Sequence, residues 1–100
     1  MCEIEKKIIE CLERQENKKL SKIERVENSI YYLWDSPIVE IKNNCILISF
    51  CGFYTNIIKQ RIRNILYYFC KINVFQKNFE IYVNNEKVDI NDTYCFLIKK

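Results

Sequence analysis

This 100-residue chain contains six cysteines and no histidine, so the cysteines are its first candidates for chemistry. Histidine is the side chain that most often transfers protons near neutral pH, and it is the commonest metal ligand. Cys51 precedes Gly52 and a predicted helix N-terminus, a position that can activate a thiol as a nucleophile. With no histidine to take its proton, the sequence favours a buried cysteine at a strand end. A cysteine-dependent enzyme is kept as an alternative.

The other ionisable side chains form no catalytic or metal-binding pattern. The carboxylate pairs Glu80/Glu86 and Asp89/Asp92 fall in or beside predicted turns, where acids usually serve backbone hydrogen bonding. No two cysteines have the C-x-x-C spacing that structural zinc sites use. The six cysteines are Cys2, Cys11, Cys45, Cys51, Cys70 and Cys95. We therefore expect no catalytic residue, no metal site and no cofactor, and we expect the protein not to be an enzyme.

The clearest functional pattern is a basic and aromatic face on one predicted helix. Lys59, Arg63 and Tyr67 recur every four residues, so donors for phosphates share a helix face with a ring suited to stacking. A solvated helix face has the same appearance, and aromatic residues also anchor protein interfaces. The predicted binding residues are Tyr54, Lys59, Arg61, Arg63, Tyr67, Lys71 and Lys77.

The positive charge of the chain is local. The net charge is +3, and residues 1–28 hold seven acids and seven bases that cancel. No acid occurs between Glu40 and Glu80, whereas six bases fall in that interval. A local positive surface attracts phosphates or acidic protein faces.

The N-terminal segment MCEIEKKIIECLER carries acids from its third residue and has no apolar stretch of the kind found in signal peptides. This favours a reducing compartment and free cysteines. No segment approaches the roughly 20 apolar residues that a membrane span requires. We therefore expect a cytoplasmic protein with no membrane partner.

The elements that position these residues begin with a helical segment over residues 1–28. Residues 2–15 carry apolar side chains at helical spacing. Residues 21–24, Ser-Lys-Ile-Glu, have the form of a capping box and predict the start of a second short helix. The alternative is one continuous helix to about residue 28.

Beyond residue 29 the pattern changes from helix to strand. Residues 30–34, 38–42 and 45–51 are rich in β-prone side chains. The Asn-Asn pair at positions 43 and 44 predicts a two-residue hairpin turn that pairs Lys42 with Cys45. The residues that this register places on one face are Val39, Ile41, Ile46, Ile48 and Phe50. Because that face is wholly apolar, the pattern supports the hairpin.

A central amphipathic helix is predicted over residues 56–70, with Thr55 as its N-cap and Gly52 at the joint that precedes it. Its predicted buried face consists of Ile58, Ile62, Ile65 and Phe69, with Leu66 at the margin and Arg61 near the boundary.

The last part of the chain predicts three strands. Residues 71–76 and 79–84 flank a predicted turn at Lys77-Asn78, and residues 93–98 are apolar on both faces, which predicts a central strand. The residues expected to share a face of the hairpin are Ile72, Val74, Phe79, Ile81 and Val83. The sequence thus predicts a single α+β domain over residues 1–100, with a helical segment at 1–28, a core at 29–100 and the order α-βββ-α-βββ.

Several short motifs between residues 31 and 83 are shared with other proteins. They are the strand end Trp34-Asp35-Ser36-Pro37-Ile38-Val39, the helix entrance Gly52-Phe53-Tyr54-Thr55, the run Lys59-x-Arg61-Ile62 and the hairpin Val74-Phe75-Gln76-Lys77. In these features the chain resembles a loose group of small phage-encoded proteins of unknown function. Residues 1–28 lie outside the resemblance, and Cys51 departs from the small residue expected there. The resemblance implies a phage or mobile-element setting and supplies no mechanism.

These observations together predict a small phage-type accessory protein that binds and inhibits a host nucleic-acid-guided defence complex, in the manner of an anti-CRISPR. The expected partner is a host protein or ribonucleoprotein complex in the host cytoplasm, with nucleic acid itself as a further partner. Direct regulation through DNA or RNA binding is the alternative. A homodimer formed through the N-terminal helix is left open.

Overall fold

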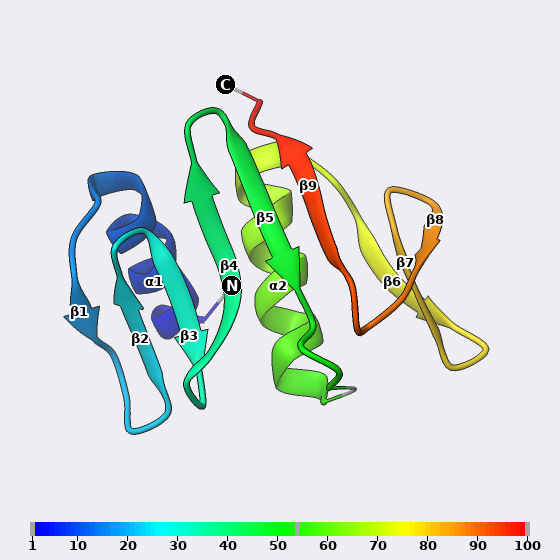
Figure 1. Ribbon diagram of the computed structural model, residues 1–100, viewed down its shortest axis with the longest axis horizontal. Helices are drawn as coiled ribbons and strands as arrows, with labels where there is room; N and C mark the ends of the chain where they lie inside the picture. The colour runs from blue at the N-terminus through cyan, green and yellow to red at the C-terminus, as the bar shows by residue number, and fades with distance from the viewer. Residues whose placement is uncertain (1, 54, 100) are drawn as a thin grey trace.

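The computed structural model describes residues 2–53 and 55–99, which form an α+β fold (Figure 1). Its elements along the chain are α1 (Glu3–Arg14), β1 (Lys18–Lys19), β2 (Glu24–Glu27), β3 (Ile30–Leu33), β4 (Ser36–Lys42), β5 (Cys45–Ser49), α2 (Asn56–Cys70), β6 (Val74–Lys77), β7 (Glu80–Val83), β8 (Glu86–Val88) and β9 (Thr93–Leu97). No helix among these residues is long and apolar enough to cross a membrane.

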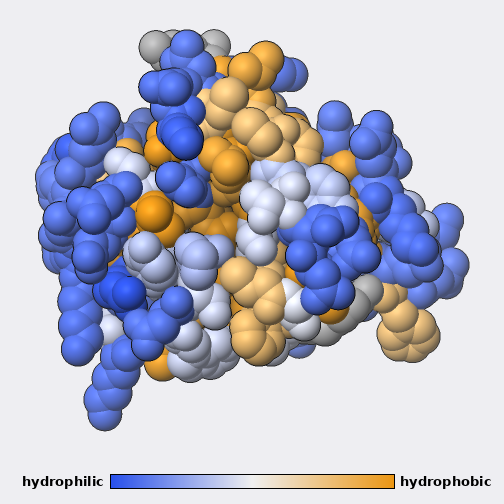
Figure 2. All heavy atoms as spheres, in the orientation of Figure 1, coloured by the Kyte–Doolittle hydropathy of each residue, from blue (hydrophilic) through white to orange (hydrophobic). Residues whose placement is uncertain are grey.

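The strands form two antiparallel sheets. The larger has the order β1-β2-β3-β4-β5-β9, and the smaller has the order β6-β7-β8. Helix α1 lies behind β1–β3, and α2 lies behind β4, β5 and β9, so both helices cover the same face of the larger sheet (Figure 1). Figure 2 looks onto the opposite face of that sheet, where apolar residues gather near the centre and hydrophilic residues at both sides.

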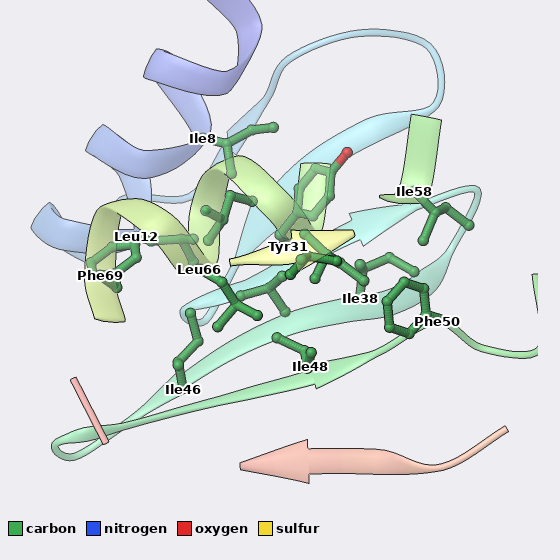
Figure 3. Packing of buried hydrophobic residues seen from close by; sticks show 14 of the residues in the cluster. Ile8, Leu12, Tyr31, Ile38, Ile46, Ile48, Phe50, Ile58, Leu66 and Phe69 are labelled. Atoms are coloured by element: carbon green, nitrogen blue, oxygen red, sulfur yellow. The ribbon is translucent and has the colours of Figure 1, made fainter. Parts of the chain in front are cut away.

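The core lies between the helices and the larger sheet. The β4–β5 hairpin has the predicted register, with Lys42 opposite Cys45 and Val39 opposite Ile48. A β-bulge between β3 and β4 also turns Ile38 into the core. Figure 3 shows Ile38, Ile46 and Ile48 from these strands gathered with Ile8, Leu66 and Phe69 from the two helices.

The helix predicted over residues 2–15 is confirmed as α1, whereas the second short helix predicted from Ser21 and the alternative of one continuous helix to about residue 28 are both wrong, because residues 18–19 and 24–27 form strands. Gln15 adopts a left-handed conformation with φ 58° and closes the helix. Ser21 Oγ does donate to Glu24 Oε2 over 3.3 Å, but the two residues shape the turn between β1 and β2 and cap no helix. Ser and Glu bond the local backbone in turns as well as in helices, so the motif did not distinguish them.

The apolar stripe of α1 is used inside the chain. Ile8, Ile9, Cys11 and Leu12 are all buried in the core. A dimer through α1 would therefore have to use the polar face of this helix, and the homodimer stays a prediction.

Helix α2 has the predicted bounds, and its predicted apolar residues are buried. Thr55 is its N-cap by position, but its side chain makes no capping hydrogen bond. The Thr55 hydroxyl is buried and has no partner among the described residues. The prediction that Thr55 caps through its side chain is therefore wrong.

The second hairpin is shifted by two residues from its predicted register. Its turn is Asn78-Phe79, and Val74 pairs with Val83. Because a shift of two preserves the faces of a strand, Val74, Ile81 and Val83 still face the core. Phe79 does not, since it sits in the turn with 86% of its surface exposed. Asn tolerates the left-handed conformation at the first turn position, which places the turn at Asn78.

The order of elements along the chain differs from the predicted α-βββ-α-βββ by three added strands, β1, β2 and β8. The predicted central strand, β9, pairs only with β5 and lies at the edge of the larger sheet. Both faces of β9 carry apolar residues, but only one of them is half-buried, the face with Tyr94 and Phe96. The other face points outward, and Leu97 on it is 71% exposed.

Candidate binding groove between α2 and β6

The exposed side of α2 and strand β6 enclose a groove, which we call the α2–β6 groove. It consists of two hollows of about 200 and 180 Å³ that share Arg63 as a lining residue. Its floor and walls are formed by Lys59, Arg63 and Tyr67 from α2 and by Asn73, Phe75 and Gln76 from β6 and the segment before it.

The cations of the groove come from successive turns of α2. The Nζ of Lys59 donates a hydrogen bond to Oε1 of Gln76, which joins the helix to β6 across the groove. Arg63, one turn later, is exposed and has no ion pair among residues 2–53 and 55–99. Its guanidinium therefore offers several N–H donors in a fixed fork to a ligand.

Two aromatic rings stand at the groove. Tyr67 is 53% exposed, and Nζ of Lys71 lies 5.3 Å from the centre of its ring. Phe75 is partly exposed and stacks on Tyr82 with 5.2 Å between the ring centres and 11° between the planes. Each ring is therefore held in place by a neighbour while part of it stays open to solvent.

One other predicted binding residue lies outside the groove. Lys77 ends β6 opposite Glu80 and does not line the groove. The Glu80 carboxylate accepts from Lys87 Nζ over 2.7 Å, and this interaction lowers the pKa of Glu80. The predicted residue Tyr54 falls outside the residues that the structure describes.

Arg61 is not a binding residue, because it lies in the core with 8% of its surface exposed. Its Nε donates to Glu24 Oε1 over 2.8 Å, and its Nη1 donates to Glu5 Oε2 over 2.9 Å. The Tyr31 hydroxyl donates to the same oxygen of Glu24. The prediction placed Arg61 near the boundary of the helix face, and buried carboxylates from α1 and β2 draw it inward.

The Arg61–Glu5–Glu24 cluster keeps its charges because every one of them is paired. Burial alone would raise the pKa of Glu5, but hydrogen bonds from Asn64 and Arg61 hold it below its ordinary value. Burial alone would lower the pKa of Arg61, and the bonds to Glu24 and Glu5 raise it instead. Burial and the bond to Glu24 raise the pKa of Tyr31.

Asn64 connects this buried cluster to the groove. Its Nδ2 donates to Glu5 Oε1 over 2.8 Å, and the residue also lines one hollow of the groove beside Arg63. The cluster thus fixes the rotation of α2 about its axis, which determines the residues that face β6.

Cys51, the candidate nucleophile, bonds to groups that do not titrate near neutral pH. Its Sγ lies 3.4 Å from the Pro37 carbonyl oxygen and 3.5 Å from Ser49 Oγ. The part of the chain that the structure describes contains no group of three or more Cys, Asp and Glu side chains that could hold a metal ion.

Sequence reasoning missed the β6 side of the groove, formed by Asn73, Phe75 and Gln76. The sequence signal that could have revealed it was the hairpin motif Val74-Phe75-Gln76-Lys77. This motif is shared with the similar phage proteins, and the polar Gln76 within it has no evident role in the core. Only the packing of β6 against α2 shows that Gln76 accepts a hydrogen bond from Lys59.

The family model described as "Kyanoviridae Gp96 protein" matches residues 1–97. This match includes residues 1–28, which lay outside the resemblance between residues 31 and 83. No curated protein and no solved structure matches the chain.

Proposed function

The chain belongs to the Kyanoviridae Gp96 family of phage proteins, and from this premise we propose that it is a stoichiometric inhibitor that binds a host nucleic-acid-guided defence complex. In this proposal the α2–β6 groove contacts single-stranded nucleic acid of that complex, such as an exposed part of its guide RNA. The protein acts by occupancy and carries out no chemical step.

The observation that carries the proposal is the position of Arg63 between two half-exposed rings. Arg63 is shared by the two hollows, Tyr67 lines one of them and Phe75 lines the other. Single-stranded nucleic acid is bound by this combination, because the bases stack on aromatic rings while basic side chains follow the phosphates. Amide side chains such as Gln60 and Asn73 add donors and acceptors for sugars or base edges.

The charge of the groove supports an anionic ligand. Lys59 and Arg63 lie one turn apart on α2, Lys71 follows the helix as its C-cap with its Nζ near the Tyr67 ring, and no acidic residue lines either hollow. The phosphates of an RNA strand can pair with these cations one after another. The affinity of the protein for RNA then falls steeply as the salt concentration rises.

The same groove favours a second candidate function, direct binding of free RNA or DNA by a phage regulator. The two functions differ in the state of the ligand: the inhibitor engages a strand already held in a protein complex, whereas the regulator binds a free strand. Their groove residues are identical.

The experiment uses a fluorescently labelled single-stranded RNA and a purified guide RNA–nuclease complex from the host. Anisotropy over a series of salt concentrations should show binding that weakens with salt, with a slope of about −0.7 per phosphate contacted. Arg63→Ala and Lys71→Asn should weaken binding and reduce the slope by about one contact each. Asn is chosen at position 71 because Lys71 has a left-handed backbone with φ 58°.

Lys42→Ala is the matched control, since Lys42 is an exposed lysine at the β4–β5 turn and lines neither hollow of the groove. Inhibition of the nuclease should saturate at one protein per complex and should be lost in Arg63→Ala. Binding of free strands with no inhibition would replace the inhibitor by the regulator. If the protein binds neither the RNA at low salt nor the complex, both functions are rejected.

A further inference from the structure

A separate hollow of about 390 Å³ opens at the other end of the molecule, where the loop between β1 and β2 meets the turn between β3 and β4. Both connections lie at the lower left in Figure 1, away from β6–β8. The Trp34 N–H donates to the Ile23 carbonyl over 2.8 Å and holds the two connections together. The volume is within the usual range of small-ligand sites, about 300–1,000 Å³. We call this hollow the Trp34 pocket, after the ring that lines it.

Trp34 occupies a backbone position that disfavours its own residue type. It has φ 50° and opens the β3–β4 turn. The other tight hairpin turns with a left-handed first residue begin with asparagine, at Asn28, Asn43, Asn78 and Asn84. Asparagine tolerates this conformation, whereas a bulky side chain is strained in it.

Burial does not offset the backbone strain at Trp34, because 48% of the surface of this residue is exposed. Strained residues of this kind concentrate at functional sites, where the surrounding structure holds them. The ring is therefore better explained by what it presents to a ligand than by its contribution to the fold.

The walls of the pocket are positively charged. Lys19 and Lys22 line it, and neither has an ion pair within the described residues. Arg25, the third cation, is already neutralised by Asp35 at 2.5 Å and stacks on Tyr32, with 4.2 Å between its guanidinium carbon and the ring centre. The Glu24 carboxylate is turned into the core toward Arg61. Two uncompensated ammonium groups thus stand beside an open indole.

From this arrangement we propose that the Trp34 pocket binds a nucleoside 5′-phosphate, with the base stacked on the indole and the phosphate held by Lys19 and Lys22. Stacking needs only the flat face of a base, and the ammonium groups need only the anionic oxygens. A nucleoside or inorganic phosphate alone would satisfy half of the site. The ligand is either a free nucleotide or the 5′-phosphorylated end of a strand, and the pocket is independent of the α2–β6 groove.

Trp34 is the only tryptophan of the chain, so its fluorescence reports on this pocket directly. Titration with AMP should quench the emission along a saturable curve. Adenosine and inorganic phosphate should each bind at least tenfold more weakly than AMP. A 5′-phosphorylated trinucleotide that binds at least tenfold more tightly than AMP identifies a strand end as the natural ligand, and equal or weaker binding identifies the free nucleotide.

Trp34→Asn removes the ring and inserts the residue type that opens the other turns, so the fold should be kept, as circular dichroism and thermal unfolding can verify. Calorimetry should then show at least a tenfold loss of AMP affinity. Lys19→Ala and Lys22→Ala should each weaken AMP binding several-fold and reduce its dependence on salt. Lys18→Ala is the control, because Lys18 neighbours Lys19 in β1 but does not line the pocket.

The proposal is overturned if millimolar AMP gives no saturable quenching, or if folded Trp34→Asn binds AMP as tightly as the original protein. Loss of AMP binding in Arg63→Ala would also overturn it, because the nucleotide would then occupy the α2–β6 groove. Failure of the groove to bind RNA leaves these outcomes unchanged, so the two proposals can fail separately.

Discussion

The guanidinium of Arg61 donates to the carboxylate of Glu24 over 2.8 Å, between residues that stand 37 positions apart in the chain. The same guanidinium donates to Glu5 from α1. One side chain of α2 therefore joins the N-terminal helix, the second strand and the central helix inside the core. A buried charge of this kind is stable only while its partners are present.

We predict that Arg61→Ala lowers the free energy of unfolding by about 3–5 kcal/mol, the usual cost of removing one partner from a buried ion pair. The substitution leaves Glu5 and Glu24 buried without their cation. Urea denaturation followed by circular dichroism measures the change.

Arg63→Ala provides the matched control, because it makes the same substitution two residues later on the exposed side of α2. We expect its free energy of unfolding to stay within about 0.5 kcal/mol of the original, as for most surface substitutions. Equal stabilities of the two variants would show that the buried cluster does not hold the N-terminal half in place.

The stability of the protein should fall in acid through Glu5. Its pKa is lower in the folded protein than the ordinary value of 4.5, so its contribution is fully present above pH 4.5 and is lost as the pH falls through the folded pKa. Glu5→Gln cannot make this contribution, and its unfolding free energy should depend less on pH below 4.5. Urea titrations between neutral pH and pH 3 compare the two slopes, and parallel slopes would contradict the prediction.

The fold was predictable from sequence where both the pattern and the turn chemistry were local. The β4–β5 register followed from Asn43 and from the alternation around it, and the bounds of α2 followed from its apolar spacing. Where only one signal was present the prediction failed. The turn predicted at Lys77-Asn78 was one residue too early, because Asn78 takes the first turn position, and β8 was missed because its first two residues are charged.

The partners of Arg61 were not predictable, because they come from segments that no local pattern connects to α2. Ser21 and Glu24 have the spacing of a helix cap, and nothing in that spacing shows that Glu24 turns into the core. The groove was half predictable for the same reason. Arg63 and Tyr67 share a helix face by periodicity, whereas Phe75 reaches them only through the packing of β6 on α2.

The Thr55 hydroxyl contributes nothing to the capping of α2, since it is buried without a partner. Thr55→Val keeps the shape and removes the unsatisfied group, so we expect the unfolding free energy to stay equal or to rise by about 1 kcal/mol. Replacing a threonine that caps through its side chain usually costs about 1 kcal/mol instead. Thr55→Ser, which keeps the hydroxyl and loses the methyl, should be less stable than Thr55→Val. A thermal unfolding series that ranks Ser above Val would contradict this account.

Gly52 is required at the joint between β5 and α2, for two separable reasons. Its φ is +76°, and a Cβ added there would lie 3.0 Å from Oδ1 of Asn91. Its N–H also donates to the Ile90 carbonyl over 2.7 Å, so the joint is tied to the segment before β9. We predict that Gly52→Ala lowers the unfolding free energy by about 1–2 kcal/mol, mainly from the left-handed backbone.

The two reasons can be separated with Asn91→Ala. In that background the added methyl meets no side-chain oxygen, so Gly52→Ala should cost less than it does in the original protein, and the remaining loss measures the backbone strain. Urea denaturation of the four variants closes the cycle. If Gly52→Ala lowers the unfolding free energy equally in both backgrounds, the requirement for glycine comes wholly from its positive φ. If Gly52→Ala lowers it in neither background, the joint can adopt a backbone conformation that any residue tolerates, and the prediction is wrong.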